Sequence, residues 1–293
     1  LSRQRWTAPL APLSRLYGRL GLGRLARSSG LERAPGIGPW LRLAAVLPGA
    51  ARAVRPCTPG SPDLELFVGC MGALAQGPAI VAALGLLEGL GLRVRVGPQD
   101  GCCGALYRHN GFPEAADAVR ARWARRPDDP PLVGLASACI AELREGDEGQ
   151  VLELCDYLDR HASLAPMGLA PLGARVLVHE PCSHRYLLKD TEVVYRLLRR
   201  VPGLEVQPLP GNATCCGAAG TYLLDQPALA GRLLAPKLAA LSERAPDYLV
   251  TTNPGCALHL AAGIREAGLT ARVCHPVELV WESAKARAPS TEA

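Results

Sequence analysis

Short apolar runs alternate with longer amphipathic stretches along most of this chain, in an order that occurs twice. In the first copy, apolar runs at residues 64–70, 92–96 and 131–139 predict strands. The segments 78–91 and 112–126 between them have the length and spacing of helices. Strands that alternate with helices are typical of a parallel sheet covered by helices. The pattern therefore predicts an α/β fold for this part of the chain.

The second copy repeats the order of the first. Its predicted strands and helices are, in chain order, residues 174–182, 191–201, 204–209, 226–241 and 247–256. We therefore expect two tandem pseudo-symmetric repeats, at residues 64–165 and 175–285, each a small parallel sheet with flanking helices. A link rich in glycine and proline near residues 162–174 separates them.

Residues 1–63 differ from the rest by their basic charge. Seven arginines precede or closely follow the first acid, Glu32, and leucines recur at roughly helical spacing, which predicts a basic helical linker. A targeting presequence is the alternative interpretation. Beyond this segment the charges nearly balance, so the net charge of +5 gives little support to nucleic-acid binding. Because no apolar run is long enough to span a bilayer and no export signal is visible, we expect no transmembrane segment and a cytoplasmic location.

Cysteines occupy the same places in both repeats. In each repeat one cysteine ends the first predicted strand, a Cys-Cys-Gly sequence follows the second strand, and a fourth cysteine ends the third. We call these eight the registered cysteines; they are Cys70, Cys102, Cys103, Cys139, Cys182, Cys215, Cys216 and Cys256. Because open parallel sheets bind ligands outside the carboxyl ends of their strands, we expect the four thiols of each repeat to converge on one pocket.

Adjacent thiols favour one kind of ligand over another. A single zinc ion usually takes CxxC-like pairs, which neither repeat contains, whereas a polynuclear cluster accepts neighbouring thiolates on different irons. The pattern favours an iron–sulfur cluster in each repeat, and zinc in one half or a zinc scaffold is the alternative. We interpret Gly104 and Gly217 as removing a side chain that would crowd the ligand. Cys57, Cys155 and Cys274 lie outside the register and are interpreted as buried apolar residues.

Several histidines lie close to the cysteines in the sequence. Near the second set are His179, His184, His259 and His275, and near the first is His109. Each of them, taken singly, is more typical of a hydrogen-bonded polar residue beside a loop than of a metal ligand. His259 follows Cys256 by three residues, the place that Glu142 holds after Cys139.

The segments "GCCGALYRHNG" (101–111), "CCGAAGTYLL" (215–224) and "TTNPGCALHL" (251–260) resemble the cysteine-rich CCG-domain family, over about residues 64–285. Within that family they are closest to the glycolate oxidase iron–sulfur subunit and lactate utilisation protein A. This resemblance implies an electron-transfer subunit without a catalytic site of its own, with [4Fe–4S] clusters held by the eight registered cysteines. It also implies a partner subunit that contains FAD and oxidises a 2-hydroxy acid such as glycolate or lactate. A quinone or another acceptor would receive the electrons, either in the cytoplasm or at the inner face of the membrane.

The sequence departs from the family pattern in two places, and each departure bears on the expected function. In the heterodisulfide reductase type, each repeat ends in CxxC and the protein is catalytic; here Glu142 and His259 replace the last cysteine, which makes that function the alternative. The ferredoxin motifs that usually lie upstream are absent from the 293 residues. Because the chain begins with Leu, we expect a fragment, with a ferredoxin-like module upstream or in a separate chain. No G-x-G-x-x-G lies between a predicted strand and helix, so we expect no flavin or nicotinamide of its own.

Overall fold

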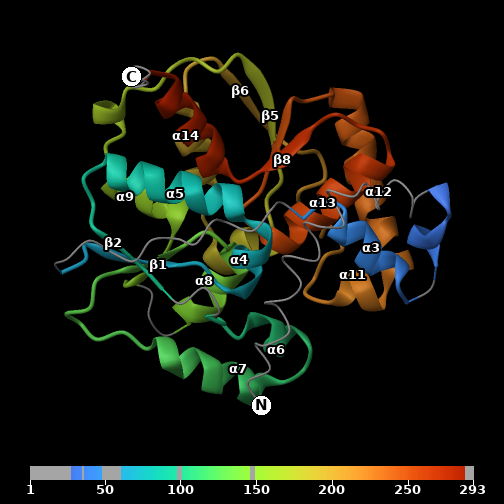
Figure 1. Ribbon diagram of the computed structural model, residues 1–293, viewed down its shortest axis with the longest axis horizontal. Helices are drawn as coiled ribbons and strands as arrows, with labels where there is room; N and C mark the ends of the chain where they lie inside the picture. The colour runs from blue at the N-terminus through green and yellow to red at the C-terminus, as the bar shows by residue number, and fades with distance from the viewer. Residues whose placement is uncertain (1–27, 35, 48–60, 98–100, 146–148, 288–293) are drawn as a thin grey trace.

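Two four-stranded sheets organise the chain, and all their strand pairs are parallel. The computed structural model describes residues 28–34, 36–47, 61–97, 101–145 and 149–287 (Figure 1). The first sheet has the order β2-β1-β3-β4 and the second β6-β5-β7-β8. The strands are β1 (Leu64–Phe67), β2 (Val94–Val96), β3 (Leu132–Gly134), β4 (Val151–Glu153), β5 (Ala174–Val178), β6 (Leu204–Pro208), β7 (Tyr248–Val250) and β8 (Arg272–Cys274). The identical orders confirm the predicted pair of tandem α/β repeats.

Each half surrounds its sheet with helices. The first half contains α4 (Cys70–Ala75), α5 (Gly77–Gly89), α6 (Ala105–His109), α7 (Pro113–Arg120), η3 (Ala121–Trp123), α8 (Ser137–Arg144) and α9 (Leu154–His161), and η4 (Ala165–Met167) follows. The second contains η5 (Ser183–Leu188), α10 (Glu192–Arg199), α11 (Tyr222–Asp225), α12 (Pro227–Arg244), α13 (Pro254–Glu266) and α14 (Pro276–Arg287). Proline in the first turn of α5, α7, α12 and α13 fixes a helical φ where no backbone N–H is needed, which is why these helices begin there.

The two halves are interlocked through their helices. Helix α14 of the second half packs on α5 of the first (Figure 1). Helix α9 of the first half packs on α10 of the second. The approach of α14 to α5 is close, because a Cβ at Gly85 would lie only 2.4 Å from the Trp281 ring. Buried side chains of both halves, such as Leu66, Ile80 and Val280, therefore form one continuous apolar core.

The strands end earlier than the sequence pattern predicts. Cys70, Cys139 and Cys256 lie in the helices that follow the strands, and Cys182 is the residue before η5. The prediction that these cysteines terminate strands is therefore wrong in detail. An apolar run does not distinguish the end of a buried strand from the first turn of a buried helix, which explains the error. The fourth strand of each sheet, β4 or β8, was also not predicted.

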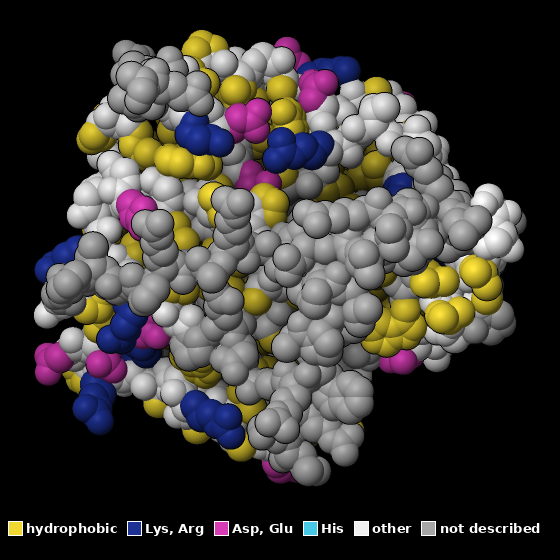
Figure 2. All heavy atoms as spheres, viewed as in Figure 1, with side chains coloured by type: hydrophobic (Ala, Val, Ile, Leu, Met, Phe, Trp, Pro, Cys, Tyr) yellow, Lys and Arg dark blue, Asp and Glu magenta, His cyan; other side chains and the backbone are white. Residues whose placement is uncertain are grey.

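The predicted linker, residues 1–63, falls largely outside the described residues, and so does Cys57. Within it, η2 (Leu31–Arg33) and α3 (Gly38–Ala44) are described, and α3 packs on α13. Glu32 of η2 accepts a hydrogen bond from Arg265 at 2.9 Å. None of the described helices combines the length and apolar character needed to cross a membrane. Figure 2 shows acidic and basic side chains interspersed among the described residues of the viewed face.

Candidate metal centres

The four registered thiols of the first half come from three separate segments. Cys70 begins α4, Cys102 and Cys103 lie in the loop before α6, and Cys139 lies in the first turn of α8. The Cys70 thiol donates a hydrogen bond to Cys102, which lowers the pKa of Cys102 to about 6. A contact with Cys103, together with burial, raises the pKa of Cys139. The fold therefore gathers these thiols in two contacting pairs and favours a thiolate at Cys102.

The second half also brings its four thiols into contact. The Cys216 and Cys256 sulfurs are 3.1 Å apart, too far for a disulfide, and both thiols are free. The hydrogen bond from Cys182 lowers the pKa of Cys215 to about 2, and the Gly217 N–H also donates to its sulfur at 3.3 Å. The hydrogen bond from Cys216 lowers the pKa of Cys256 to about 6. Two thiolates are thus favoured before any metal binds.

The glycine that follows each thiol pair lies too close to the next helix for a side chain to fit. Gly104 and Gly217 have φ values of +97° and +92°, which L-residues rarely adopt. A Cβ at Gly104 would lie 2.8 Å from the Ala116 carbonyl oxygen, and one at Gly217 would lie 2.6 Å from the Ala230 carbonyl oxygen. The interpretation that these glycines also make room for a ligand stays a prediction. They let the thiol loop lie directly against the backbone of α7 or α12.

The histidines of the second half differ in their hydrogen bonds. His184 pairs with Thr252 Oγ1 and the Asp190 carbonyl, each at 3.0 Å, and His259 pairs with the Ala230 carbonyl at 3.3 Å. His179 is only 2% exposed, and its side chain interacts with the Cys256 sulfur. Its ligand atom and the sulfurs of Cys216 and Cys256 all lie within 4.8 Å of one another. His179 is therefore the histidine that faces the second set of thiols. His109 of α6 instead lies beside Gly220.

The two residues at the place of a fifth cysteine are both engaged elsewhere. Glu142, 8% exposed, accepts hydrogen bonds of 2.7–2.9 Å from the Arg108 guanidinium. His259 uses its Nε2 on the Ala230 carbonyl. Neither residue takes the place of a fifth thiol in this arrangement.

A second group with metal-ligand spacing lies between the halves, where Glu153, Cys155 and His275 are all buried. The His275 Nε2–H donates to the Leu135 carbonyl at 3.0 Å, and its Nδ1 accepts from the Val277 N–H at 3.3 Å. Because both ring nitrogens are satisfied, we assign this group a structural role. Cys155 and Cys274 both lie in the shared apolar core.

The elements that carry the thiols of one half pack against those of the other. Helix α4 contacts α13 (Figure 1). Helix α8 contacts η5. The Ser137 and Ser183 hydroxyls, 2.9 Å apart and buried, join the segment of Cys139 to that of Cys182. The Ser137 N–H donates to the Thr252 carbonyl at 3.0 Å in the same contact. Hydrogen bonds therefore link the surroundings of the two sites directly.

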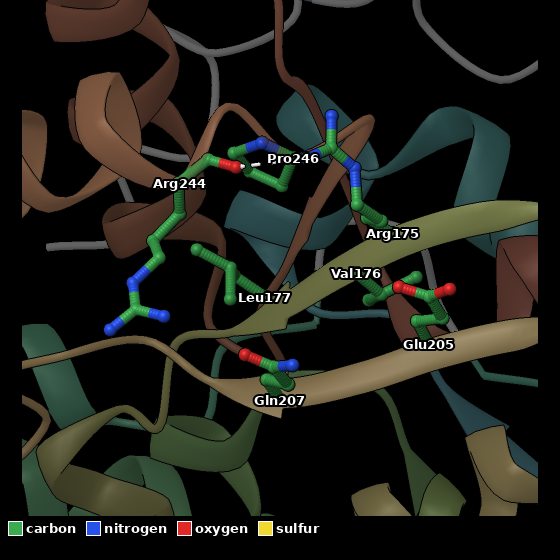
Figure 3. A pocket seen from close by; sticks show the side chains of 7 residues that line it. All are labelled: Arg175, Val176, Leu177, Glu205, Gln207, Arg244 and Pro246. Atoms are coloured by element: carbon green, nitrogen blue, oxygen red, sulfur yellow. Dashed lines mark hydrogen bonds between the residues drawn. The ribbon is translucent and has the colours of Figure 1, made fainter.

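A cavity of about 160 Å³ lies on the second sheet, away from the cysteines (Figure 3). Strands β5 and β6 and the end of α12 line it. The Arg175 guanidinium beside it donates to the carbonyls of Arg244 and Ala245, at 3.3 and 2.6 Å. The Arg175 guanidinium is thus hydrogen-bonded to backbone carbonyls. None of the lining residues is a registered cysteine.

The fold and the thiols define a class of protein: a duplicated α/β unit that gathers four cysteines beyond the strand ends of each sheet. The sequence profile of the cysteine-rich (CCG) domain matches residues 64–144 and 176–261, and the chain belongs to this family.

Proteins named for two functions are similar to the chain. It is 29% identical to lactate utilization protein A of Geobacillus kaustophilus over 74% of this chain and 98% of that protein. It is 28% identical to a probable glycolate oxidase iron-sulfur subunit of Bacillus subtilis over 92% of this chain and 67% of that one. It is 31% identical to the glycolate oxidase iron-sulfur subunit of Escherichia coli over 74% of this chain and 57% of that one.

Proposed function

We propose that this protein is an iron–sulfur electron-transfer subunit of a flavin-dependent 2-hydroxy-acid oxidoreductase, of the glycolate or lactate type. The observation that supports it most is the gathering of two sets of four free thiols, with relatives named as iron–sulfur subunits.

The donor set fits an iron–sulfur cluster. Thiolates are the usual ligands of such clusters. The fold lowers the pKa of Cys102, Cys215 and Cys256 and raises that of the cysteines that donate to them, Cys70, Cys182 and Cys216. The proposed ligands are Cys70, Cys102, Cys103 and Cys139 in the first half and Cys182, Cys215, Cys216 and Cys256 in the second. When bound, [4Fe–4S] clusters would supply one-electron oxidation and reduction. The protein's own residues hold these sulfurs, bury half of the eight cysteines and bring the two sites together through α4, α8, η5 and α13.

Further parts of the proposal concern partners. A subunit containing FAD would oxidise the hydroxy acid, and a quinone or another acceptor would take the electrons. A ferredoxin-like module would lie upstream or in a separate chain, and the complex would work in the cytoplasm, at or near the inner membrane face. A catalytic role of the heterodisulfide reductase type has less support, because Glu142 and His259 are engaged elsewhere.

A zinc scaffold is the second candidate, since His179, Cys216 and Cys256 form a mixed nitrogen and sulfur set of the kind that zinc accepts. Metal analysis separates the candidates. Iron, acid-labile sulfide and zinc are measured on protein purified without oxygen, together with its visible spectrum. Iron with matching sulfide and a coloured protein is the expected result; stoichiometric zinc without colour would refute the proposal.

Three serine variants assign the metal to its ligands. Cys103→Ser should remove the iron of the first half alone, and Cys216→Ser that of the second half alone. Cys274→Ser is the matched control, because Cys274 is 4% exposed but lies in the apolar core, and it should keep the iron content of the wild type. Loss of iron from the control would show that the ligand assignment is wrong.

A further inference from the structure

The surroundings of the two thiol sets differ at two equivalent positions. Three residues before the first thiol, the first half has Phe67 and the second has His179. On the helix after the thiol loop, Ala116 and Ala230 are equivalent, because each packs its carbonyl against the glycine of the loop. Seven residues further along, the first half has Trp123 and the second has Lys237.

In the first half these two positions form an apolar pair. The rings of Phe67 and Trp123 meet edge to face with centroids 4.8 Å apart. The Trp123 indole N–H is used on the Cys102 carbonyl at 2.9 Å. Phe67, at 1% exposed, offers no ligand atom to the thiols beside it.

In the second half both positions are polar and buried. The His179 side chain lies within ligand range of Cys216 and Cys256, and it already interacts with the Cys256 sulfur. Lys237 is 1% exposed and donates to the Gly211 carbonyl at 2.9 Å. Because Gly211 lies four residues before Cys215, this bond holds the ammonium at the thiol loop, where the cysteines favour its charged form although burial lowers the pKa of Lys237. The second thiol set therefore has an available nitrogen ligand and a buried cation that the first set lacks at these positions.

Other charges near the sites do not cancel this difference. Arg122 acts on Cys102 in the first half, but it is exposed, so water screens its charge. Glu180 of the second half is paired with Arg185 and accepts a hydrogen bond from the Tyr195 hydroxyl at 2.6 Å. A buried cation acts through a lower dielectric than an exposed one, so Lys237 has the larger effect.

We propose that His179 is a ligand of the metal group in the second half, and that this centre has a higher reduction potential than the first. His179 then takes one of the four ligand positions, so one of the four second-half thiols assigned above is not a ligand. A neutral histidine in place of a thiolate removes negative charge and raises the potential of an iron–sulfur centre. A nearby cation stabilises the reduced form further, because reduction adds negative charge. The second centre is therefore reduced first in an equilibrium titration. This inference rests on the proposed binding of iron–sulfur clusters.

The test compares ligand and potential in the same samples. Protein labelled with ¹⁵N-histidine is made in the Cys103→Ser background, which leaves only the second centre, and is reduced and examined by pulsed electron paramagnetic resonance. His179→Cys keeps a ligand at the position but removes the nitrogen. His259→Gln is the control, because glutamine still donates to the Ala230 carbonyl. Redox titrations of the wild type, His179→Cys and Lys237→Met give the order of the two potentials.

We expect a ¹⁵N coupling that persists in His259→Gln and disappears in His179→Cys, while the iron content stays unchanged. We also expect the second centre to titrate above the first, with a smaller gap in His179→Cys and in Lys237→Met. An iron-loaded second centre without the coupling, or one with a potential equal to or below that of the first, would overturn the inference. Absence of iron from both halves would instead refute the proposed function, and the metal analysis distinguishes the two failures.

Discussion

Gly217, directly after the second thiol pair, gives the sharpest test of how the loop is built. Its φ of +92° is strained for any residue with a Cβ, and an added Cβ would lie 2.6 Å from the Ala230 carbonyl oxygen and 2.9 Å from the Ala230 Cα. Both are backbone atoms, so no rotation of a side chain relieves the contact. The strained backbone alone costs about 1–3 kcal/mol, and the displacement of α12 adds to it.

Gly217→Ala should therefore lower the free energy of unfolding by about 2 kcal/mol or more. It should also reduce the metal content of the second half, because Gly217 donates its N–H to Cys215 and the Ala230 carbonyl is the partner of His259. Urea unfolding and metal analysis on the same preparation measure both effects.

Gly231→Ala, in the first turns of the same helix, is the matched control. A Cβ there meets nothing within 4 Å, and its φ is an ordinary one. Alanine in a helix should stabilise the protein by about 0.5–1 kcal/mol. A Gly217→Ala protein with the stability and metal content of the wild type would refute the steric account of the loop.

Two further predictions concern buried carboxylates. Burial raises the pKa of Glu153 from its ordinary 4.5 to about 8, so the folded protein holds a proton that the unfolded chain releases, and stability should fall as the pH rises between these values. Glu153→Gln should flatten that dependence in urea unfolding measured from pH 5 to about pH 8, and an unchanged slope would exclude Glu153 as its source. Arg108→Ala should lower the free energy of unfolding by about 2–3 kcal/mol, because it leaves Glu142 buried without its partner. Arg199→Ala breaks an exposed pair and should lower it by less than about 1 kcal/mol in the same assay. Equal costs would contradict the importance of burial.

The repeated order of strands and helices was predictable because the same alternation of apolar runs and amphipathic segments occurs in both repeats. The details at the strand ends were not. Strand β3 is only Leu132–Gly134, and the apolar run around it continues into α8, so the pattern placed Cys139 in a strand. Strands β4 and β8 have three residues each, too few for the alternation to be visible in the sequence.

The register of the eight cysteines was visible in the sequence, and the structure brings the thiols of each half together. The contrast between Phe67 and His179 was equally available, since both stand three residues before a registered cysteine. The contrast between Trp123 and Lys237 was hidden, because the spacing from the loop glycine to the helix differs between the halves. Only the packing of each glycine on Ala116 or Ala230 fixes the correct alignment.

Duplication explains why the two sites share a frame and yet differ in their surroundings. Cysteine positions and the loop glycines are constrained by backbone geometry, so they are the same in both halves. The residues at the positions of His179 and Lys237 act on the thiols only through their side chains, so the backbone geometry does not require the same residue type in both halves. Because α5 packs on α14 and α9 on α10, the two halves share one of their core clusters. A metal that binds the folded state of one half therefore stabilises the fold on which the other site depends.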